Sequence, residues 1–112
     1  MNPSSIAVPV VRARTPLQRF VGLLGRWRPA PGHGLLFERC RAVHTFGMRR
    51  PIDVVFVDRT GRVLALHRGL GGGRIAACRQ AAMVIELQVG DAWRLGLWPG
   101  CRITPIDVRG SR

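Results

Sequence analysis

The strongest strand pattern in the chain lies in residues 52–57, Ile-Asp-Val-Val-Phe-Val. Every position except Asp53 is apolar and several are β-branched, which predicts a strand buried on one face and largely on the other. Residues 58–61 follow with Asp, Thr and Gly at positions that favour a turn. The apolar residues within 62–68 predict a returning strand, so 52–68 is expected to form a β-hairpin.

Other short apolar runs predict further strands. They occupy residues 6–14, 34–39, 41–45, 83–89 and 101–108. Proline cannot donate a hydrogen bond to a sheet ladder. Pro9 is therefore expected to place the first of these strands at a sheet edge, and Pro105 is expected to interrupt the last.

Two segments have helical character. The first begins at Thr15-Pro16, a favourable helix start, and carries one apolar stripe at helical spacing: Leu17, Phe20, Val21 and Leu24. Residues 90–97 predict one or two helical turns in which Trp93 and Leu97 face inward. Trp98 follows in a turn and is expected to cap the core.

Together these elements predict a mainly β fold with a minor α component. We expect a small β-sandwich or partly open barrel of about six or seven short strands with one or two short helices. The glycine-rich residues 69–74 predict a flexible connection, because their spacing matches no phosphate-binding motif. A chain of 112 residues is expected to form a single domain over 1–112, with a frayed tail at 109–112.

The charge of the chain is strongly positive. Eighteen arginines and no lysine stand against six acidic residues, which gives a formal net charge of +12. The planar guanidinium makes bidentate hydrogen bonds to phosphate and carboxylate groups, which favours an anionic partner. The codon usage of a GC-rich genome also yields chains rich in Arg, Ala, Gly and Pro, so both explanations stay open.

No segment predicts export or membrane insertion. The N-terminal residues lack a basic region and their short apolar run is broken by Pro9, so no secretory signal is predicted. No apolar run approaches the length of a membrane-spanning helix. A cytoplasmic location is expected, in which Cys40, Cys78 and Cys101 would remain free thiols.

Several blocks of the sequence occur in the order found in a known family. The chain contains TPLQRFVGLLGR at 15–26, GLLF at 34–37, FGMRRPIDVVFVD at 46–58 and VIELQVG at 84–90. These blocks resemble the T-x-x-x-R-x-x-G-L-M-x-R, G-M-L-F, F-W-M-x-x-x-x-I-P-L-D-I-x-F-I-D and V-L-E-L-x-A-G motifs of the prokaryotic domain-of-unknown-function family 192. The resemblance implies a compact, mostly β domain with no established activity. Gly47 stands where the family usually has Trp, which implies a reshaped pocket.

Polar residues just before and within the hairpin form the first candidate site. They are His44, Thr45, Arg49, Arg50 and Asp53. They suit a non-enzymatic binding or accessory module for an anionic small molecule, a glycan or an acidic protein. Asp53 is expected to form an ion pair with Arg49 or Arg50, because a half-buried carboxylate needs a partner. Glu86, within an apolar strand, is expected to need an arginine for the same reason.

Weak, sequence-independent nucleic-acid binding is the alternative function. It requires little more than a basic surface, here Arg26, Trp27, Arg28, Arg39 and Arg41. Trp27 lies in a predicted open loop and is available for base stacking. The sequence predicts no helix-turn-helix, zinc finger or aromatic-rich RNA-binding strand.

A small hydrolase is the third hypothesis. His44 would act as the general base and Asp53 would orient it. No Ser or Cys has the context of an activated nucleophile such as G-x-S-x-G, so no catalytic residue is assigned. The three His and three Cys match no metal or haem spacing, so neither a metal nor a cofactor is expected.

Overall fold

The computed structural model describes residues 4–13 and 30–108. Eight strands and one short helix occur in these ranges. They are β1 (Ile6–Arg12), β2 (Gly34–Glu38), β3 (Ala42–His44), β4 (Ile52–Val57), β5 (Val63–Leu70), β6 (Ile75–Ala77), β7 (Met83–Gln88), α2 (Asp91–Arg94) and β8 (Ile103–Asp107). The helix predicted from Thr15 and the predicted tail at 109–112 lie outside the described residues.

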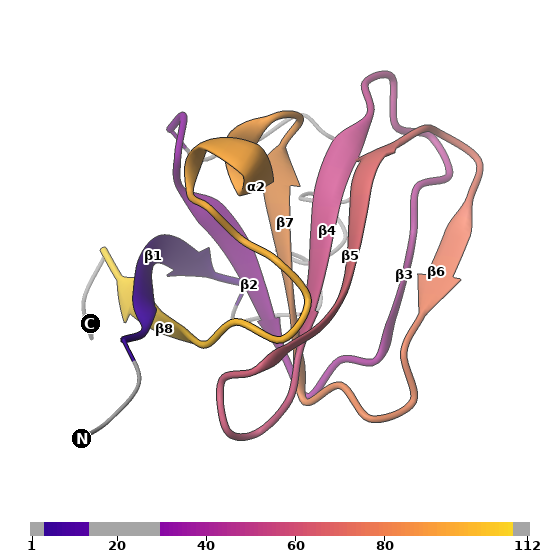
Figure 1. Cartoon of the computed structure of the whole chain (residues 1–112). Coiled ribbons are helices and arrows are strands. Elements are labelled where there is room, and N and C mark those ends of the chain that lie inside the picture. The colour runs from indigo at the N-terminus through magenta and orange to yellow at the C-terminus, as the bar shows by residue number, and fades with distance from the viewer. Residues whose placement is uncertain (1–3, 14–29, 109–112) are drawn as a thin grey trace.

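Six strands form one mixed sheet in the order β5-β4-β7-β2-β1-β8, and β3 pairs with β6 in a separate two-stranded sheet (Figure 1). Each neighbouring pair in the run β5-β4-β7-β2 is antiparallel, whereas β1 runs parallel to both β2 and β8. The mainly β fold and the hairpin of β4 and β5 are confirmed. The large sheet stays open, although an isolated bridge joins Arg62 before β5 to Arg102 before β8.

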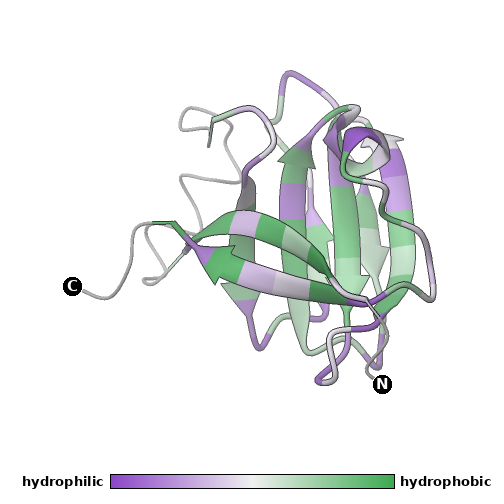
Figure 2. Ribbon diagram, turned by 60° about the vertical axis from the view of Figure 1, so that its left-hand side comes forward, coloured by the Kyte–Doolittle hydropathy of each residue, from purple (hydrophilic) through white to green (hydrophobic). Residues whose placement is uncertain are grey.

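Two apolar layers cover the faces of the large sheet. On one face Val55 and Ile85 pack with residues of β1, β8 and α2. On the other face Val54 packs in a cluster with Val43 of β3 and Ala76 of β6. Strand β4 is buried at all six positions because it lies inside the sheet with a layer on each side. The hydrophobic colouring along the central strands in Figure 2 follows from this arrangement.

The turn between β4 and β5 is organised by Asp58. Its Oδ1 accepts hydrogen bonds from the Thr60 N–H (2.8 Å), the Thr60 hydroxyl (2.7 Å) and the Arg62 N–H (3.0 Å). The bond from the Thr60 hydroxyl is the largest cause of a lowered Asp58 pKa. Gly61 ends the turn at φ +89°, and a Cβ there would lie 2.7 Å from the carbonyl oxygen of Ile103. The turn therefore meets the start of β8 where only glycine fits.

The expected effects of the two prolines are wrong. Strand β1 lies between β2 and β8 and is not an edge. Its pairings are staggered, with residues 6–10 beside β8 and residues 10–12 beside β2. Only the β8 side is paired at Pro9, which explains how the sheet interior accepts a proline. Pro105 lies within the edge strand β8 and does not interrupt it.

Two further features differ from the sequence expectations. Strand β6 was not predicted, because its three residues are too few to form a recognisable pattern. Trp93, expected to face inward, is 66% exposed, whereas Leu97 is fully buried as predicted. Helix α2 has only four residues, so a small difference in helical phase decides which side chain faces the core.

Candidate functional site

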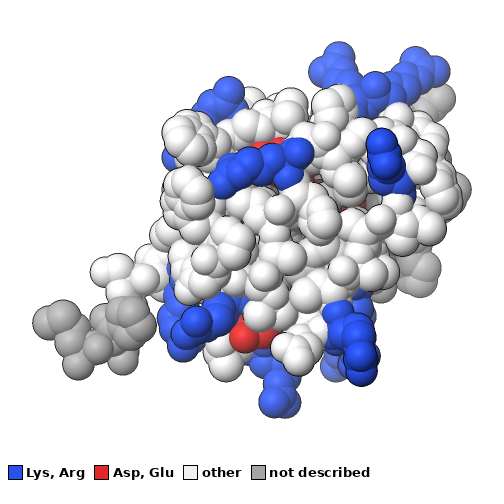
Figure 3. Space-filling model, turned by 45° about the vertical axis from the view of Figure 1, so that its right-hand side comes forward, with Lys and Arg blue, Asp and Glu red and all other residues white. Residues whose placement is uncertain are grey.

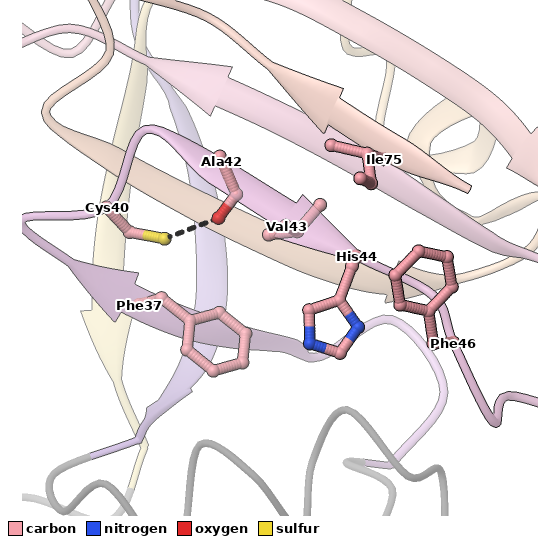
Figure 4. A pocket seen from close by; sticks show the side chains of 7 residues that line it. All are labelled: Phe37, Cys40, Ala42, Val43, His44, Phe46 and Ile75. Atoms are coloured by element: carbon pink, nitrogen blue, oxygen red, sulfur yellow. Dashed lines mark hydrogen bonds between the residues drawn. The ribbon is translucent and has the colours of Figure 1, made fainter. Parts of the chain in front are cut away.

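A groove of about 240 Å³ lies beside β3 (Figure 4). The described residues that line it are Phe37, Cys40, Ala42, Val43, His44, Phe46 and Ile75. The lining side chains are apolar except for the His44 imidazole and the Cys40 thiol, and that thiol donates a hydrogen bond to the Ala42 carbonyl oxygen at 3.1 Å. His44 is therefore the polar side chain that the groove offers to a ligand. Figure 4 shows its ring between Phe37 and Phe46.

Strand β3 places His44 in this groove. Val43 also lines the groove and is buried against the large sheet, whereas its neighbour His44 is only half-buried and pairs with Ile75 of β6. The imidazole stacks on Phe46 with ring centroids 5.0 Å apart. Its Nδ1 is buried and has no hydrogen-bond partner. Orphaned buried N–H donors are rarer in proteins than unsatisfied acceptors, so a tautomer that carries its proton on Nε2 fits this geometry better than one that carries it on Nδ1.

Thr45 is fully buried and fastens the segment after β3 to the segment before β6. Its hydroxyl donates a hydrogen bond to the Gly71 carbonyl oxygen at 2.6 Å and accepts one from the Arg74 N–H at 2.8 Å. Its backbone N–H donates to the Arg74 carbonyl oxygen at 2.8 Å. A Cβ on Gly72 would lie 2.6 Å from the Met48 carbonyl oxygen, so the glycine-rich segment permits close backbone packing here. These hydrogen bonds hold the backbone at Thr45 and thereby position its neighbour His44 in the groove.

Asp53 is 1% exposed and fastens β4 to two other segments. Oδ1 accepts a hydrogen bond from the Gly69 N–H at 2.9 Å. Oδ2 accepts hydrogen bonds from the Gly90 N–H at 3.0 Å and the Ala92 N–H at 3.1 Å. Gly90 is the N-cap residue of α2 and has no side chain to cap the helix, so Asp53 supplies the capping carboxylate.

Arg49 and Arg50 are exposed in the bend that leads from Phe46 to β4. The expected ion pair of Asp53 with one of them is wrong. Three backbone N–H groups satisfy the Asp53 carboxylate, and no arginine in the described ranges pairs with it. The two guanidinium groups therefore remain at the surface, close in sequence to the groove.

The His44–Asp53 pair that a hydrolase would need is not formed. The His44 ring stacks on Phe46, and both oxygens of Asp53 bind backbone N–H groups. Within residues 4–13 and 30–108, no carboxylate bonds to His44. The groove thus presents a histidine without the group that would orient it as a general base.

The residues proposed for nucleic-acid binding are only partly described. Arg39 and Arg41 are exposed at the loop after β2. Arg26, Trp27 and Arg28 lie outside the described residues. On the face shown in Figure 3, arginines stand at several separate places and do not form one continuous stripe.

The surface is nevertheless strongly cationic. Every arginine in the described ranges is exposed except Arg102, which is half-buried. Among the six carboxylates of the chain, Asp53, Glu86 and Asp91 are buried. Half of the acidic side chains therefore lie inside the protein, whereas the described arginines lie at or near its surface.

The sequence missed one exposed aromatic cluster. Trp93 and Trp98 are 66% and 54% exposed, although both were expected in or over the core. Arg68 of β5 lies beside both rings. The local sequence gives no signal of this cluster, because only the fold brings Arg68 to the two tryptophans.

Glu86 is a buried carboxyl on the central strand β7. It lies between Leu35 of β2 and Val54 of β4 in the sheet register. Its Oε2 has no hydrogen-bond partner, and no arginine of the described ranges pairs with it. Burial raises its pKa from 4.5 to about 7. The expected arginine partner is thus not found among the described residues, and desolvation shifts the equilibrium toward the neutral acid.

Two classes of site are not found in the described part of the chain. No group of three or more His, Cys, Asp or Glu residues there is arranged to hold a metal ion. None of its helices has the length and apolar character needed to cross a membrane.

Comparison with known proteins identifies the family. The sequence matches the family model of DUF192, described as "Uncharacterized ACR", over residues 2–105. The chain belongs to the DUF192 family. The resemblance of the sequence blocks to this family is thereby confirmed. The DUF192 hairpin block contains Asp53, whose hydrogen bonds give it a structural role.

Two solved structures are similar to this DUF192 protein. One, from Sinorhizobium meliloti 1021, is described as a "putative transcription regulator"; it is 34% identical with a TM-score of 0.69, over 83% of this chain and 78% of that one. The other is a protein of unknown function from Novosphingobium aromaticivorans DSM 12444. It is 24% identical with a TM-score of 0.70, over 83% of this chain and 71% of that one, and supports the fold alone. Among curated proteins no match is found.

Proposed function

We propose that this DUF192 protein is a non-enzymatic binding module whose groove beside β3 takes a small anionic ligand with an apolar body. The apolar body would contact Phe37, Phe46 and Ile75, and the anionic group would accept a hydrogen bond from His44. The groove volume of about 240 Å³ is below the roughly 300–1,000 Å³ of sites for drug-sized ligands. The ligand is therefore a small molecule or the end group of a larger one.

The observation that carries this proposal is the state of the His44 ring. Nδ1 is buried without a partner, which favours the tautomer with N–H on Nε2. No described residue hydrogen-bonds Nε2, and the ring stands in the groove (Figure 4). A donor held on an apolar wall is well suited to a carboxylate or phosphate oxygen, because a charge-assisted bond is stronger than a neutral one.

The charge around the groove supports an anionic ligand. Arg49 and Arg50 follow Phe46 by three and four positions, and Arg41 lies between two lining residues in the chain. All three are exposed, and none forms an ion pair with a carboxylate in the described ranges. Such uncompensated charge raises the local concentration of anions and speeds their association.

Titration with phenylacetate tests this proposal. Phenylacetamide, a neutral ligand of nearly the same shape, is the matched probe. We expect phenylacetate to shift the amide resonances of residues 42–46 and to bind more tightly than phenylacetamide. His44→Phe keeps the stacked ring and removes both nitrogens, so it should weaken phenylacetate binding by about tenfold and affect phenylacetamide less.

Two variants serve as controls. His67→Phe changes a histidine that contacts Phe56 and does not line the groove, so it should leave phenylacetate binding unchanged. Arg50→Gln should weaken binding more than Arg59→Gln, an equal charge change in the turn after β4. Equal affinity for the two probes, or equal effects of the two histidine variants, contradicts the proposal.

A further inference from the structure

Three side chains from separate elements form a second exposed cluster, which we call the Trp–Arg cluster. Arg68 comes from β5, Trp93 from α2 and Trp98 from the segment between α2 and β8. The indole rings meet edge to face, with centroids 5.9 Å apart and an interplanar angle of 67°. The Arg68 guanidinium carbon lies 5.8 Å from the Trp93 centroid and 5.3 Å from the Trp98 centroid.

The Trp–Arg cluster is held in place and remains open to solvent. Arg68 donates a hydrogen bond to the Leu97 carbonyl oxygen at 3.1 Å, which fixes its guanidinium beside the rings. Trp93 is 66% exposed and Trp98 is 54% exposed. The guanidinium thus leaves more than half of each indole side chain accessible. The contacts among the two indoles and Arg68 favour one arrangement of the rings, which reduces the rotamer entropy lost when a planar ligand stacks on them.

The charge of the Trp–Arg cluster is not neutralised by the protein. Within the described ranges, no carboxylate forms an ion pair with Arg68. The nearby Arg94 differs, because its guanidinium pairs with the buried Asp91 at 2.7 Å. Arg68 therefore combines a free positive charge with two aromatic surfaces, the pair of features that binds a phosphate and an unstacked base.

The geometry points to the Trp–Arg cluster as a binding site for single-stranded nucleic acid. An unstacked base lies against the exposed side of Trp93 or Trp98, and Arg68 binds a backbone phosphate. Because the indoles are inclined to each other, successive bases must splay apart, which a flexible single strand permits and a duplex does not. This site lies apart from the groove and does not depend on the ligand proposed for it.

Other partners fit these observations less well. A membrane interface requires a broad apolar surface, but Val89 is the one other large exposed hydrophobic residue next to α2 among those described. Helix α2 itself has only four residues and cannot lie along a bilayer. The buried carboxylates and exposed arginines of the described surface instead favour a polyanion over a neutral protein partner.

Binding of a fluorescein-labelled oligothymidylate of about ten nucleotides tests this inference. We expect binding at low salt, with shifts of the indole Nε1–H resonances of Trp93 and Trp98. Trp93→Ala and Trp98→Ala should each weaken binding by about tenfold, the loss expected for one stacked base. Arg68→Gln should weaken binding and reduce the slope of log K against log salt by roughly 0.7.

Matched controls separate stacking from general charge attraction. Arg79→Gln removes the same charge from an exposed turn and should change affinity by less than about twofold. A duplex of the same length should bind more weakly than the single strand. Thermal unfolding of each variant confirms that the fold survives, as expected for exposed side chains.

Four results would overturn the inference. They are no oligothymidylate binding at low salt, tryptophan variants that bind as the wild type does, equal losses from Arg68→Gln and Arg79→Gln, and duplex binding equal to single-strand binding. Vesicles of equimolar phosphatidylglycerol and phosphatidylcholine provide the remaining comparison. Tryptophan-dependent binding to these vesicles without oligothymidylate binding would identify a bilayer as the partner and exclude nucleic acid.

Discussion

Asp53 in β4 accepts the backbone N–H of Ala92 in α2 at 3.1 Å, across 39 positions of the chain. The same carboxylate binds the N–H groups of Gly69 and Gly90. One buried side chain on β4 is therefore hydrogen-bonded to the end of β5, to the residue before α2 and to the first turn of α2. The negative charge is placed where the helix presents unsatisfied donors.

Replacing this carboxylate tests its structural role. Asp53→Asn leaves one acceptor oxygen and directs an amide N–H₂ toward a backbone donor, so we expect a loss of about 2–4 kcal/mol in the free energy of unfolding. Denaturant unfolding measures it. Asp58→Asn in the exposed turn is the control and should cost less. If Arg49→Gln or Arg50→Gln lowered the free energy of unfolding as much as Asp53→Asn does, the result would contradict this role and support an ion pair between Asp53 and that arginine.

Glu86 makes stability depend on pH. Its pKa is raised from 4.5 to about 7 by burial, so its folded state favours the protonated form. Glu86 therefore binds its proton more tightly in the folded state than in the unfolded state. The stability that this difference gives is fully present below pH 4.5 and is lost as the pH rises from 4.5 through 7. The corresponding decrease in unfolding free energy is about 3 kcal/mol. We expect Glu86→Gln to remove this decrease between pH 5 and pH 8.5; an unchanged pH profile would contradict it.

Thr45 does not line the groove and should affect ligand binding only by holding His44 in position. Thr45→Val keeps the shape but removes the hydroxyl that binds Gly71 and Arg74. We expect about 1–3 kcal/mol of destabilisation, because the backbone groups left behind lose their partner. Phenylacetate binding should weaken as His44 loses its fixed position. Thr60→Val, in the exposed turn after β4, is the control and should leave phenylacetate binding unchanged.

Gly61 and Gly71 provide a matched pair of substitutions. Gly61 has φ +89° and would place a Cβ 2.7 Å from the Ile103 carbonyl oxygen, whereas a Cβ on Gly71 meets nothing within 4 Å. Gly61→Ala should therefore lower the free energy of unfolding by about 1–3 kcal/mol or more. Gly71→Ala should be neutral or slightly stabilising, because it restricts the unfolded chain. Similar unfolding free energies for the two variants would show that the turn rearranges at little cost.

The parts of the fold that were predicted correctly depend on local patterns. Strand β4 and its return in β5 follow from consecutive apolar residues and a four-residue turn, which sequence alone reveals. The partners of Asp53 are 16, 37 and 39 positions away, so no local pattern identifies them. An arginine close in sequence was the natural expectation, but backbone N–H groups brought by the fold satisfied the carboxylate instead.

The candidate site also depends on residues that are far apart in the sequence. His44 was predicted from the sequence as a site residue and stays a prediction; Phe37 and Ile75, which line the same groove, come from β2 and β6 and were not predicted with it. Strand β6 was too short to predict. The Trp–Arg cluster was missed because burial is the usual role of a tryptophan in an apolar segment, and only the position of α2 turns Trp93 outward.

The most direct test of the groove hypothesis is the pair of ¹⁵N chemical shifts of the His44 ring, with and without phenylacetate. We expect an unprotonated Nδ1 and a protonated Nε2 in the free protein, because Nδ1 is buried without a partner. Phenylacetate should then shift the Nε2–H signal of His44 and leave that of His67 in place. A proton on Nδ1 in the free protein, or a His44 signal that does not move at millimolar phenylacetate, would contradict the proposed site.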